Sequence, residues 1–373
     1  MTQGFDLTLL MLITTLFVPF TGVLTAITPY LMRRGEVFAV TVPASAQQDP
    51  FVKRLKRRYA AAVLLATAVF TIAGAACTLA GNGAGVMVVL IGGELVLLVG
   101  GYALMLRYRS LTRAYKREQG WVAAAQEAVA VVGEQPVPRA ISLKWNLLYV
   151  PVILVTAAIG IAAYPHMPDL IPLHADFDGT VNRWEPKGPG VVAFPVIVQL
   201  FLVACFAFSH WIILRSKKWS EPGAPATSAL AYGLFARAQS VFLLVSGVLV
   251  AACVGLAFEL SALGAISLGQ AAVVVLVATL PLVAGSLVIS AVYGQAGSRV
   301  FKRMQATDEL LVDDDCHWKL GVFYCNPDDA SLFLPERFGV GWTVNWARPA
   351  AWAIMAGSVL VSVAFVAALA LFA

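Results

Sequence analysis

Long uncharged hydrophobic runs alternate with short polar segments along the 373 residues of the chain. A helix that crosses the hydrocarbon core of a bilayer needs about 20 mostly apolar residues. Eight runs reach that length, and they predict eight membrane-spanning helices at 7–30, 60–79, 85–105, 147–164, 191–214, 230–257, 271–292 and 351–372. An even number of spans places both termini on the same side of the membrane.

The lysine and arginine residues distinguish the two sides. The loops at 31–58, 106–146, 215–218 and 293–350 are basic, whereas the opposite side carries only Arg183 and Lys187. Loops rich in Lys and Arg remain in the cytoplasm. We therefore predict a multi-pass protein of a bacterial cytoplasmic membrane, with both termini extracytoplasmic.

Composition supports this class. Hydrophobic residues make up 60% of the chain and charged residues only 13%, against about 25% charged residues in a soluble domain. The mean hydropathy is +0.80. The net charge of +5 comes from inter-helix loops, so we expect no nucleic-acid partner. No phosphate-binding loop or common catalytic motif is present, which argues against an ATP-driven pump, and we expect neither a cofactor nor a resident metal.

The predicted fold class is an all-α polytopic membrane protein with a small cytoplasmic β-hairpin unit before the last helix. Five parts follow along the chain: a three-helix region at 1–146, a helix pair with an external loop at 147–214, a two-helix region at 215–307, the cytoplasmic β unit at 308–350 and the last helix at 351–373.

The external loop at 165–190 is rich in proline, histidine and aspartate. Prolines hold the chain extended, and Asp178-Gly179 predicts a turn. Metal ligands are available in His166, His174 and Asp176, but no zinc-type spacing is present. Two other interpretations are a compact loop held against the helix ends by hydrogen bonds, and an external ligand site with a titratable histidine.

The cytoplasmic stretch before the last span contains short β-prone runs at 318–324, 331–335 and 338–345, separated by the turn 326–329. Metal ligands are also available here in Cys316, His317 and Cys325, but the two cysteines are nine residues apart and form no CxxC motif of a structural zinc site. We interpret Asp313, Asp314 and Asp315 as an acidic linker into the hairpin, and Asp328 and Asp329 as turn residues.

One acidic residue interrupts a hydrophobic run. Glu94 lies near the middle of the third predicted span, where a carboxylate is costly unless it faces a bundle interior or a cavity. It is a candidate proton or ion site, or a protonated packing residue, and Arg237 in the sixth span is a candidate partner. The basic amphipathic stretch at 49–59 is expected to lie on the anionic inner leaflet and lead into the second span.

Two segments carry a family resemblance. The external loop, with Pro168, Pro172, His174, Asp176, Gly179, Trp184 and Lys187, resembles the SdpI-like bacterial membrane proteins, which contain a domain of unknown function, DUF1648. The cytoplasmic stretch resembles a second uncharacterised domain, DUF5808; its motif positions are Trp318, Gly321, Tyr324, Asn326, Asp328, Asp329, Arg337, Gly339 and Asn345. The resemblance implies an immunity protein that counters a secreted peptide toxin and signals to a cytoplasmic regulator.

Three functions are therefore compared. The leading hypothesis is a non-enzymatic envelope protein of the immunity or sensor type, whose external loop meets a peptide toxin or ligand and whose cytoplasmic surface relays or recruits. The second is an ion-coupled secondary transporter that uses Glu94. The third is a membrane-embedded metal-dependent enzyme that uses His166, His174 and Asp176.

Overall fold

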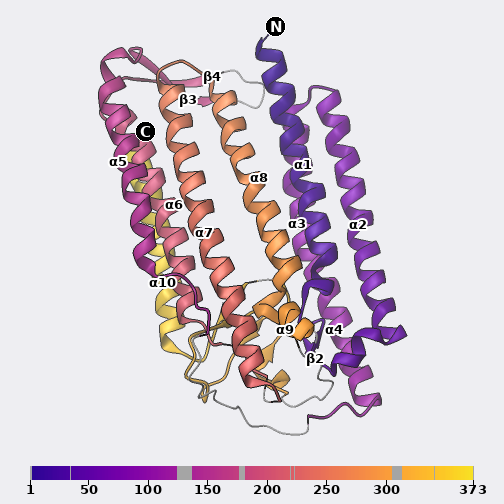
Figure 1. Ribbon diagram of the computed structural model, residues 1–373. Helices are drawn as coiled ribbons and strands as arrows, with labels where there is room; N and C mark the ends of the chain where they lie inside the picture. The colour runs from indigo at the N-terminus through magenta and orange to yellow at the C-terminus, as the bar shows by residue number, and fades with distance from the viewer. Residues whose placement is uncertain are drawn as a thin grey trace.

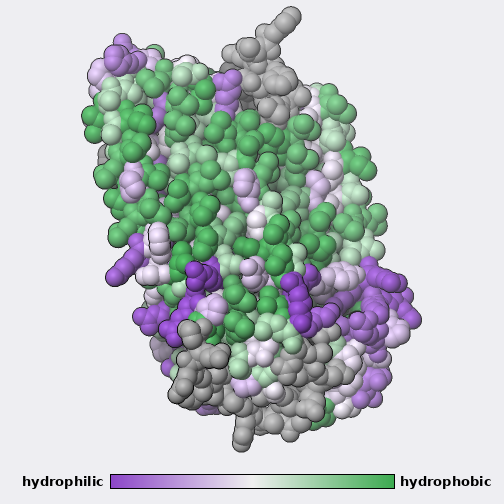
Figure 2. Space-filling model, in the orientation of Figure 1, coloured by the Kyte–Doolittle hydropathy of each residue, from purple (hydrophilic) through white to green (hydrophobic). Residues whose placement is uncertain are grey.

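The computed structural model describes residues 2–33, 35–123, 137–175, 181–218, 220–221, 223–304, 313–339 and 341–372. It confirms the predicted class, an all-α polytopic membrane protein, with eight helices long and apolar enough to cross a membrane. Hydrophobic residues cover the middle of the molecule, and hydrophilic residues gather toward its two ends (Figure 2). This distribution is the one that a bilayer-spanning bundle requires.

The spans are formed by helices that mostly start and end near their predicted limits. They are α1 (Thr2–Leu31), α2 (Pro50–Leu79), the run α3 (Gly83–Leu95), η2 (Val96–Gly100) and α4 (Gly101–Glu118), η3 (Leu143–Leu148) with α5 (Tyr149–Ala163), α6 (Gly190–Arg215), α7 (Pro225–Ala262), α8 (Leu268–Tyr293) and α10 (Pro349–Phe372). A short helix, α9 (Ser298–Met304), follows α8 after the turn η5 (Gln295–Gly297).

The helices form two groups joined by α8. In Figure 1, α1, α2 and α3 stand on one side of α8, and α5, α6, α7 and α10 stand on the other. Helix α8 packs against both α1 and α7. Helix α7 is 38 residues long and is the most buried of the candidate spans. Together α7 and α8 form the centre of the molecule.

Small β elements lie at both ends of the bundle. Strands β3 (Leu170–Ala175) and β4 (Val181–Pro186) form a hairpin near the N-terminus, at what we call the hairpin end (Figure 1). At the opposite end, called the basic end, are β1 (Glu36–Val37) with β2 (Val40–Thr41), β5 (Trp318–Lys319) with β6 (Phe323–Tyr324), and β7 (Phe333–Pro335) with β8 (Trp342–Val344). We call residues 313–345 the β unit.

The basic stretch at 49–59 differs from its prediction. Asp49 accepts hydrogen bonds from the backbone of Phe51 and Val52 and so caps α2, which continues without a break into the span. Leu55 and Tyr59 are buried in the core of the α1–α4 group. The apolar face of this stretch therefore packs against the protein, and Lys53 and the three arginines face outward.

Candidate functional site

The β3–β4 hairpin is built from the proline-rich loop. Its strands pair antiparallel, with Pro172 opposite Trp184 and His174 opposite Arg183, and the register shifts on both sides of His174. Such irregularities bend a strand and redirect its side chains. Proline lacks the N–H that a central strand donates to its neighbours, so it is found on edge strands. Both strands of a two-stranded hairpin are edge strands, and the hairpin therefore accommodates this proline-rich sequence.

His174 is an exposed titratable residue of the hairpin. Its Nδ1 lies 2.7 Å from Oδ1 of Asn182 on the facing strand. Because an amide oxygen accepts, Nδ1 carries the hydrogen in this contact. Trp184 is 52% exposed. A polar ring and a large apolar side chain are thus presented together at the hairpin end.

Lys187 closes the base of the loop. Its Nζ donates to the carbonyl of Met167 at 3.0 Å, and its backbone N–H donates to the carbonyl of Asp169 at 2.7 Å. The ammonium also lies 5.3 Å from the ring centroid of Tyr164. The carboxylate of Asp169 is fully exposed, so its 3.9 Å contact with Lys187 contributes little. Lys187 therefore holds the loop in shape.

The hairpin rests on the end of α7. Met167 and Ile171 are buried against Ala262, and Val191 and Leu263 pack around them. Helix α8 also contacts β3. Pro168 is exposed, and Asp176 and Gly179 lie outside the described residues. Among the residues described here, no group of three or more His, Cys, Asp or Glu could hold a metal ion.

Beneath the hairpin lies a buried polar layer that the sequence analysis missed. Gln199 of α6 is fully buried and donates to Thr156 of α5 at 2.8 Å and to the carbonyl of Ala251 of α7 at 2.9 Å. Glu259 of α7 is 1% exposed. It was overlooked because the sixth span was expected to end at residue 257, whereas α7 continues to Ala262.

His210 of α6 was also missed, although a histidine inside an apolar run was a usable signal. It is 1% exposed. Its ring nitrogens lie 3.0 Å from Oδ1 of Asn146 and 2.9 Å from the carbonyl of Ile141. These contacts fasten the segment before α5 to α6.

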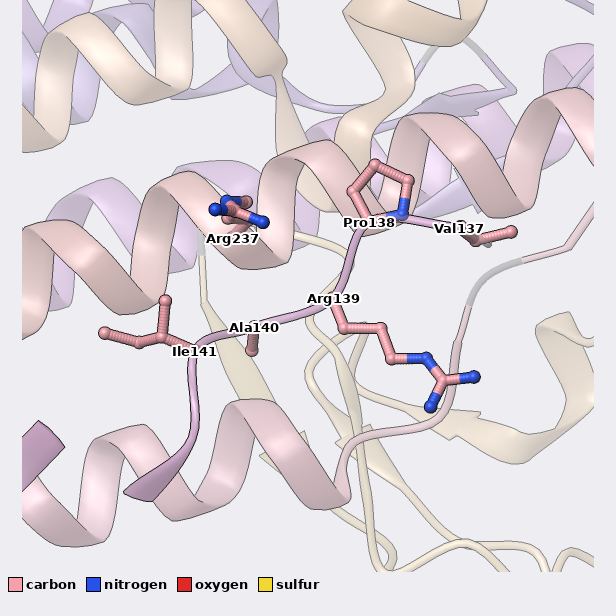
Figure 3. Close-up of a pocket in the computed structure, with 6 residues that line it drawn as sticks. All are labelled: Val137, Pro138, Arg139, Ala140, Ile141 and Arg237. Carbon is pink, nitrogen blue, oxygen red and sulfur yellow. The ribbon is translucent and has the colours of Figure 1, made fainter. Parts of the chain in front are cut away.

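Glu94 and Arg237 lie on different parts of the bundle. Glu94 is on α3 beside the π-helical turn η2, and its Oε1 is buried without a hydrogen-bond partner among the described residues. Arg237 is exposed on α7 and lines a pocket of about 560 Å³ with residues 137–141. Figure 3 shows that the Arg139 side chain points away from Arg237. No ion pair joins Arg237 to Glu94 in the described part of the chain, so the suggested pairing is wrong.

The basic end contains a buried ion cluster centred on Arg337. The guanidinium, with its side chain 2% exposed, contacts the carboxylates of Asp314 and Asp315 and lies 3.6 Å from Glu36. It also donates to the hydroxyl of Thr41 at 2.8 Å. The planar guanidinium suits several carboxylates at once. This cluster ties the β unit to the β1–β2 loop.

Two further cations extend the cluster into α4. Lys116 lies 2.6 Å from Asp313 and 3.0 Å from Asp315. Arg109 donates to the carbonyl of Ala39 and, at 3.1 Å, to that of Trp318. The three aspartates are therefore ion-pair partners of α4 and Arg337, and their interpretation as an acidic linker was wrong. The spacing of charges in sequence could not reveal partners about 200 residues away.

The charges in the cluster are strongly coupled. Burial opposes ionisation of Asp315, but Arg337 and Lys116 outweigh it and hold its pKa well below the usual range. Burial also opposes the charge of Arg337, and the nearby acids Asp314, Glu36 and Asp315 reverse that effect and raise its pKa. Burial raises the pKa of Glu36 despite Arg33 and Arg337. The cluster remains ionised at Asp315 and Arg337 at neutral pH.

Asn345 organises the interior of the β unit. It is fully buried and makes four hydrogen bonds: its amide donates to the carbonyls of Asn326 and Asp329, and its oxygen accepts from the backbone of Asn326 and Ala347. Tyr324 donates to Asp329 at 3.0 Å. These motif residues are structural, because each satisfies a buried polar group.

The remaining motif positions serve turns and contacts. Asp328 is exposed and its backbone N–H donates to Oδ1 of Asn326, in agreement with the predicted turn chemistry. Asp329 does more, since burial is outweighed by Lys217, at 2.6 Å, and by Ser331, which lower its pKa to about 2. Gly321 has φ +80° and faces Arg109, while Gly339 has φ +119°; Trp318 is buried beneath the Arg337 guanidinium.

We expect Glu336 to make the stability of the β unit depend on pH. Burial raises its pKa to about 7. The folded unit favours the protonated form of Glu336. Its contribution to the free energy of unfolding is therefore complete below about pH 4.5 and is lost as the pH rises through 7. The wild type should lose on the order of 2 kcal/mol of stability between pH 5 and 8, and Glu336→Gln should not show this loss. The melting temperature in detergent, followed by tryptophan fluorescence, measures this change.

Glu118→Gln is the matched control, because Glu118 is exposed at the end of α4. It should leave the wild-type pH dependence unchanged. An equal slope for wild type and Glu336→Gln would contradict the assignment.

The fold and these contacts define a polytopic α-helical membrane protein with a structured β element at each end of a central helix pair. Residues 152–198 match a domain of unknown function (DUF1648), and residues 327–352 match a family of unknown function (DUF5808). Both domains named by the sequence resemblance are thereby confirmed. Neither a curated protein nor a solved structure matches the chain.

The matched regions correspond to the two sites described above. The first covers most of α5, the hairpin loop and the first part of α6. The second covers the turn after β6, the β7–β8 ladder and the start of α10. It includes Arg337 and Asn345, the two buried polar centres of the β unit.

Proposed function

We propose that this chain is a non-enzymatic membrane sensor of the immunity type in a bacterial cytoplasmic membrane. A peptide ligand meets the β3–β4 hairpin outside the cell, and the β unit on the cytoplasmic side provides the output. The observation that carries the proposal is that one helix pair, α7–α8, contacts both β elements. At the hairpin end, Ala262 packs in the cluster that seats the hairpin.

At the basic end, the same pair holds the β unit. The ring centroids of Phe235 of α7 and Trp342 of β8 are 5.8 Å apart. The amide of Gln295, two residues after the end of α8, donates to the carbonyls of Glu336 and Gly341 and accepts from the N–H of Gly341. Helix α7 has 38 residues and is therefore about 57 Å long. A rigid element with contacts at both ends is suited to couple them.

The form of the hairpin favours a peptide ligand. In the part of the chain described, β3 and β4 make a two-stranded ladder, so each strand has an outer edge. Extended peptides bind such edges through main-chain hydrogen bonds. Trp184 and His174 beside the edge add an apolar and a polar contact. A secreted membrane-active peptide combines both features.

The test is protection of a sensitive bacterium. Cells that express the chain are challenged with a panel of membrane-active peptides, at matched protein levels in the membrane. We expect protection, and we expect His174→Ala to lower the tolerated peptide concentration about tenfold, as for loss of one contact worth about 1.4 kcal/mol.

His166→Ala is the control, since His166 is exposed in the same loop but precedes the hairpin. It should protect as well as the wild type. Equal loss in both variants would contradict a specific role for His174, and equal survival with and without the protein would count against the immunity type.

A proton-coupled carrier is the second candidate function. The observation that favours it is Glu94, with one buried carboxylate oxygen unpartnered among the described residues, beside a π-helical turn. Such turns are frequent at functional sites. In the same experiment, loss of protection in Glu94→Gln together with full protection in His174→Ala would favour export of the peptide over sensing.

A further inference from the structure

The structure contains a buried carboxyl group that neither the hairpin nor the β unit uses. Glu259 is 1% exposed, and neither of its carboxylate oxygens has a hydrogen-bond partner among the described residues. An ionised carboxylate in an apolar interior without a partner is strongly unfavourable, and such a group is stable as the neutral acid. We propose that Glu259 is a proton-binding site at the junction of α5, α6 and α7.

The surroundings of Glu259 are shaped to receive it. A β-carbon at position 160 of α5 would lie 2.7 Å from its Oε1 and 3.0 Å from a methyl carbon of Val192 of α6. Gly160 therefore makes the space that the carboxyl group occupies. Gly160 and Val192 both belong to the region that matches DUF1648.

A second polar layer lies one helical turn deeper. Gly255 is four residues before Glu259 on α7, and Thr156 is four residues before Gly160 on α5, so each pair is about one turn apart. A β-carbon at position 255 would meet the amide of Gln199 at 2.2 Å and the hydroxyl of Thr156 at 2.5 Å. The Oε1 of Gln199 is itself buried without a partner among the described residues. The layer next to Glu259 thus offers an acceptor but no cation.

No titratable side chain around Glu259 neutralises it in the described part of the chain. The ionisable residues on the packed elements are Tyr149 of α5, Tyr164 beyond it, Cys205, His210 and Arg215 of α6, Tyr232, Arg237 and Cys253 of α7, Tyr293 of α8, and His166, Asp169, His174, Arg183, Glu185 and Lys187 of the loop and hairpin. None forms an ion pair or hydrogen bond with Glu259 in that part of the chain. Lys187 is engaged with Met167.

Proton release from Glu259 would affect the hydrophobic cluster that packs the hairpin against the end of α7. The backbone carbonyl of Glu259 accepts from Leu263, which packs with Ala262 against Met167 and Ile171. Val191, the neighbour of Val192, belongs to the same cluster. A charge at Glu259 would draw water into this junction. The protonated site therefore keeps the hairpin seated, and deprotonation loosens it.

Infrared spectroscopy of the full chain in lipid nanodiscs tests the proton site directly. We expect the C=O stretching band of a buried protonated carboxylic acid at neutral pH, shifted in D₂O, and we expect it to decrease at high pH. Glu259→Gln should remove this band, and Glu94→Gln should retain it. A band unchanged in Glu259→Gln would overturn the proposal. A band that disappears at constant pH when choline chloride is replaced by sodium chloride would assign the site to a sodium ion instead.

Hydrogen exchange over residues 170–175 and 181–186 tests the coupling. After correction for intrinsic rates, exchange in the wild type should increase about tenfold at the pH where the infrared band decreases. This factor corresponds to a loss of about 1.4 kcal/mol in the free energy of local opening of the hairpin. Glu259→Gln, which cannot ionise, should stay protected. Equal pH dependence in both proteins would overturn the coupling. No peptide ligand enters either measurement, so their outcome is separate from that of the sensor proposal.

Discussion

Arg337→Met is expected to destabilise the attachment of the β unit by about 3–5 kcal/mol. The guanidinium is the common partner of Glu36, Asp314 and Asp315 and is almost fully buried. Methionine fills similar space but removes the cation that the three carboxylates share, which leaves Asp315 with Lys116 and Glu36 with the more distant Arg33. The expected magnitude is that of an uncompensated buried charge, which is far larger than the loss of a surface ion pair.

Hydrogen exchange across 313–345 in the full chain measures this effect. Arg337→Lys should be intermediate, because lysine restores the charge but not the planar arrangement of donors. Arg54→Met is the control, since Arg54 is exposed on α2, and it should change exchange by less than about 0.5 kcal/mol. If Arg337→Met and Arg54→Met behave alike, the cluster does not hold the β unit.

Gly297→Ala is expected to separate the turn after α8 from α7. Gly297 has φ +82°, and a β-carbon there would lie 2.3 Å from the carbonyl oxygen of Ala231 and 2.9 Å from the backbone nitrogen of Tyr232. Both contacts are with backbone, so no side-chain rotation relieves them. Left-handed strain and overpacking together should destabilise this junction by about 2–5 kcal/mol.

Gly264→Ala provides a matched control. Gly264 also has positive φ, +71°, but a β-carbon at this position meets nothing within 4 Å in the described structure. Its expected cost is about 1–2 kcal/mol, from backbone strain alone. Thermal unfolding in detergent compares the two variants. For the sensor proposal, Gly297→Ala should retain peptide binding at the hairpin and lose the response of the β unit. Equal melting temperatures for the two variants would show that the close approach to α7 is unimportant.

The spans were predictable because membrane insertion depends on local properties of the sequence. Each of the eight runs carries enough apolar residues to cross the bilayer by itself. The β-prone runs of the β unit were also recognisable, since alternation and turn residues are local signals. The hairpin at 170–186 was expected only as an extended loop with a turn, because proline within a run argues against a β-strand.

Tertiary structure decided which polar groups meet. Arg337, Asp315 and Lys116 are far apart in sequence and form one cluster. Glu94 drew attention because it interrupts a run, yet Glu259, near the end of a longer helix, is an acid that is only 1% exposed. Hydrophobic transfer adds up residue by residue, so sequence reveals the spans. Pairing of buried charges depends on the packing of distant elements, so it appears only in the folded chain.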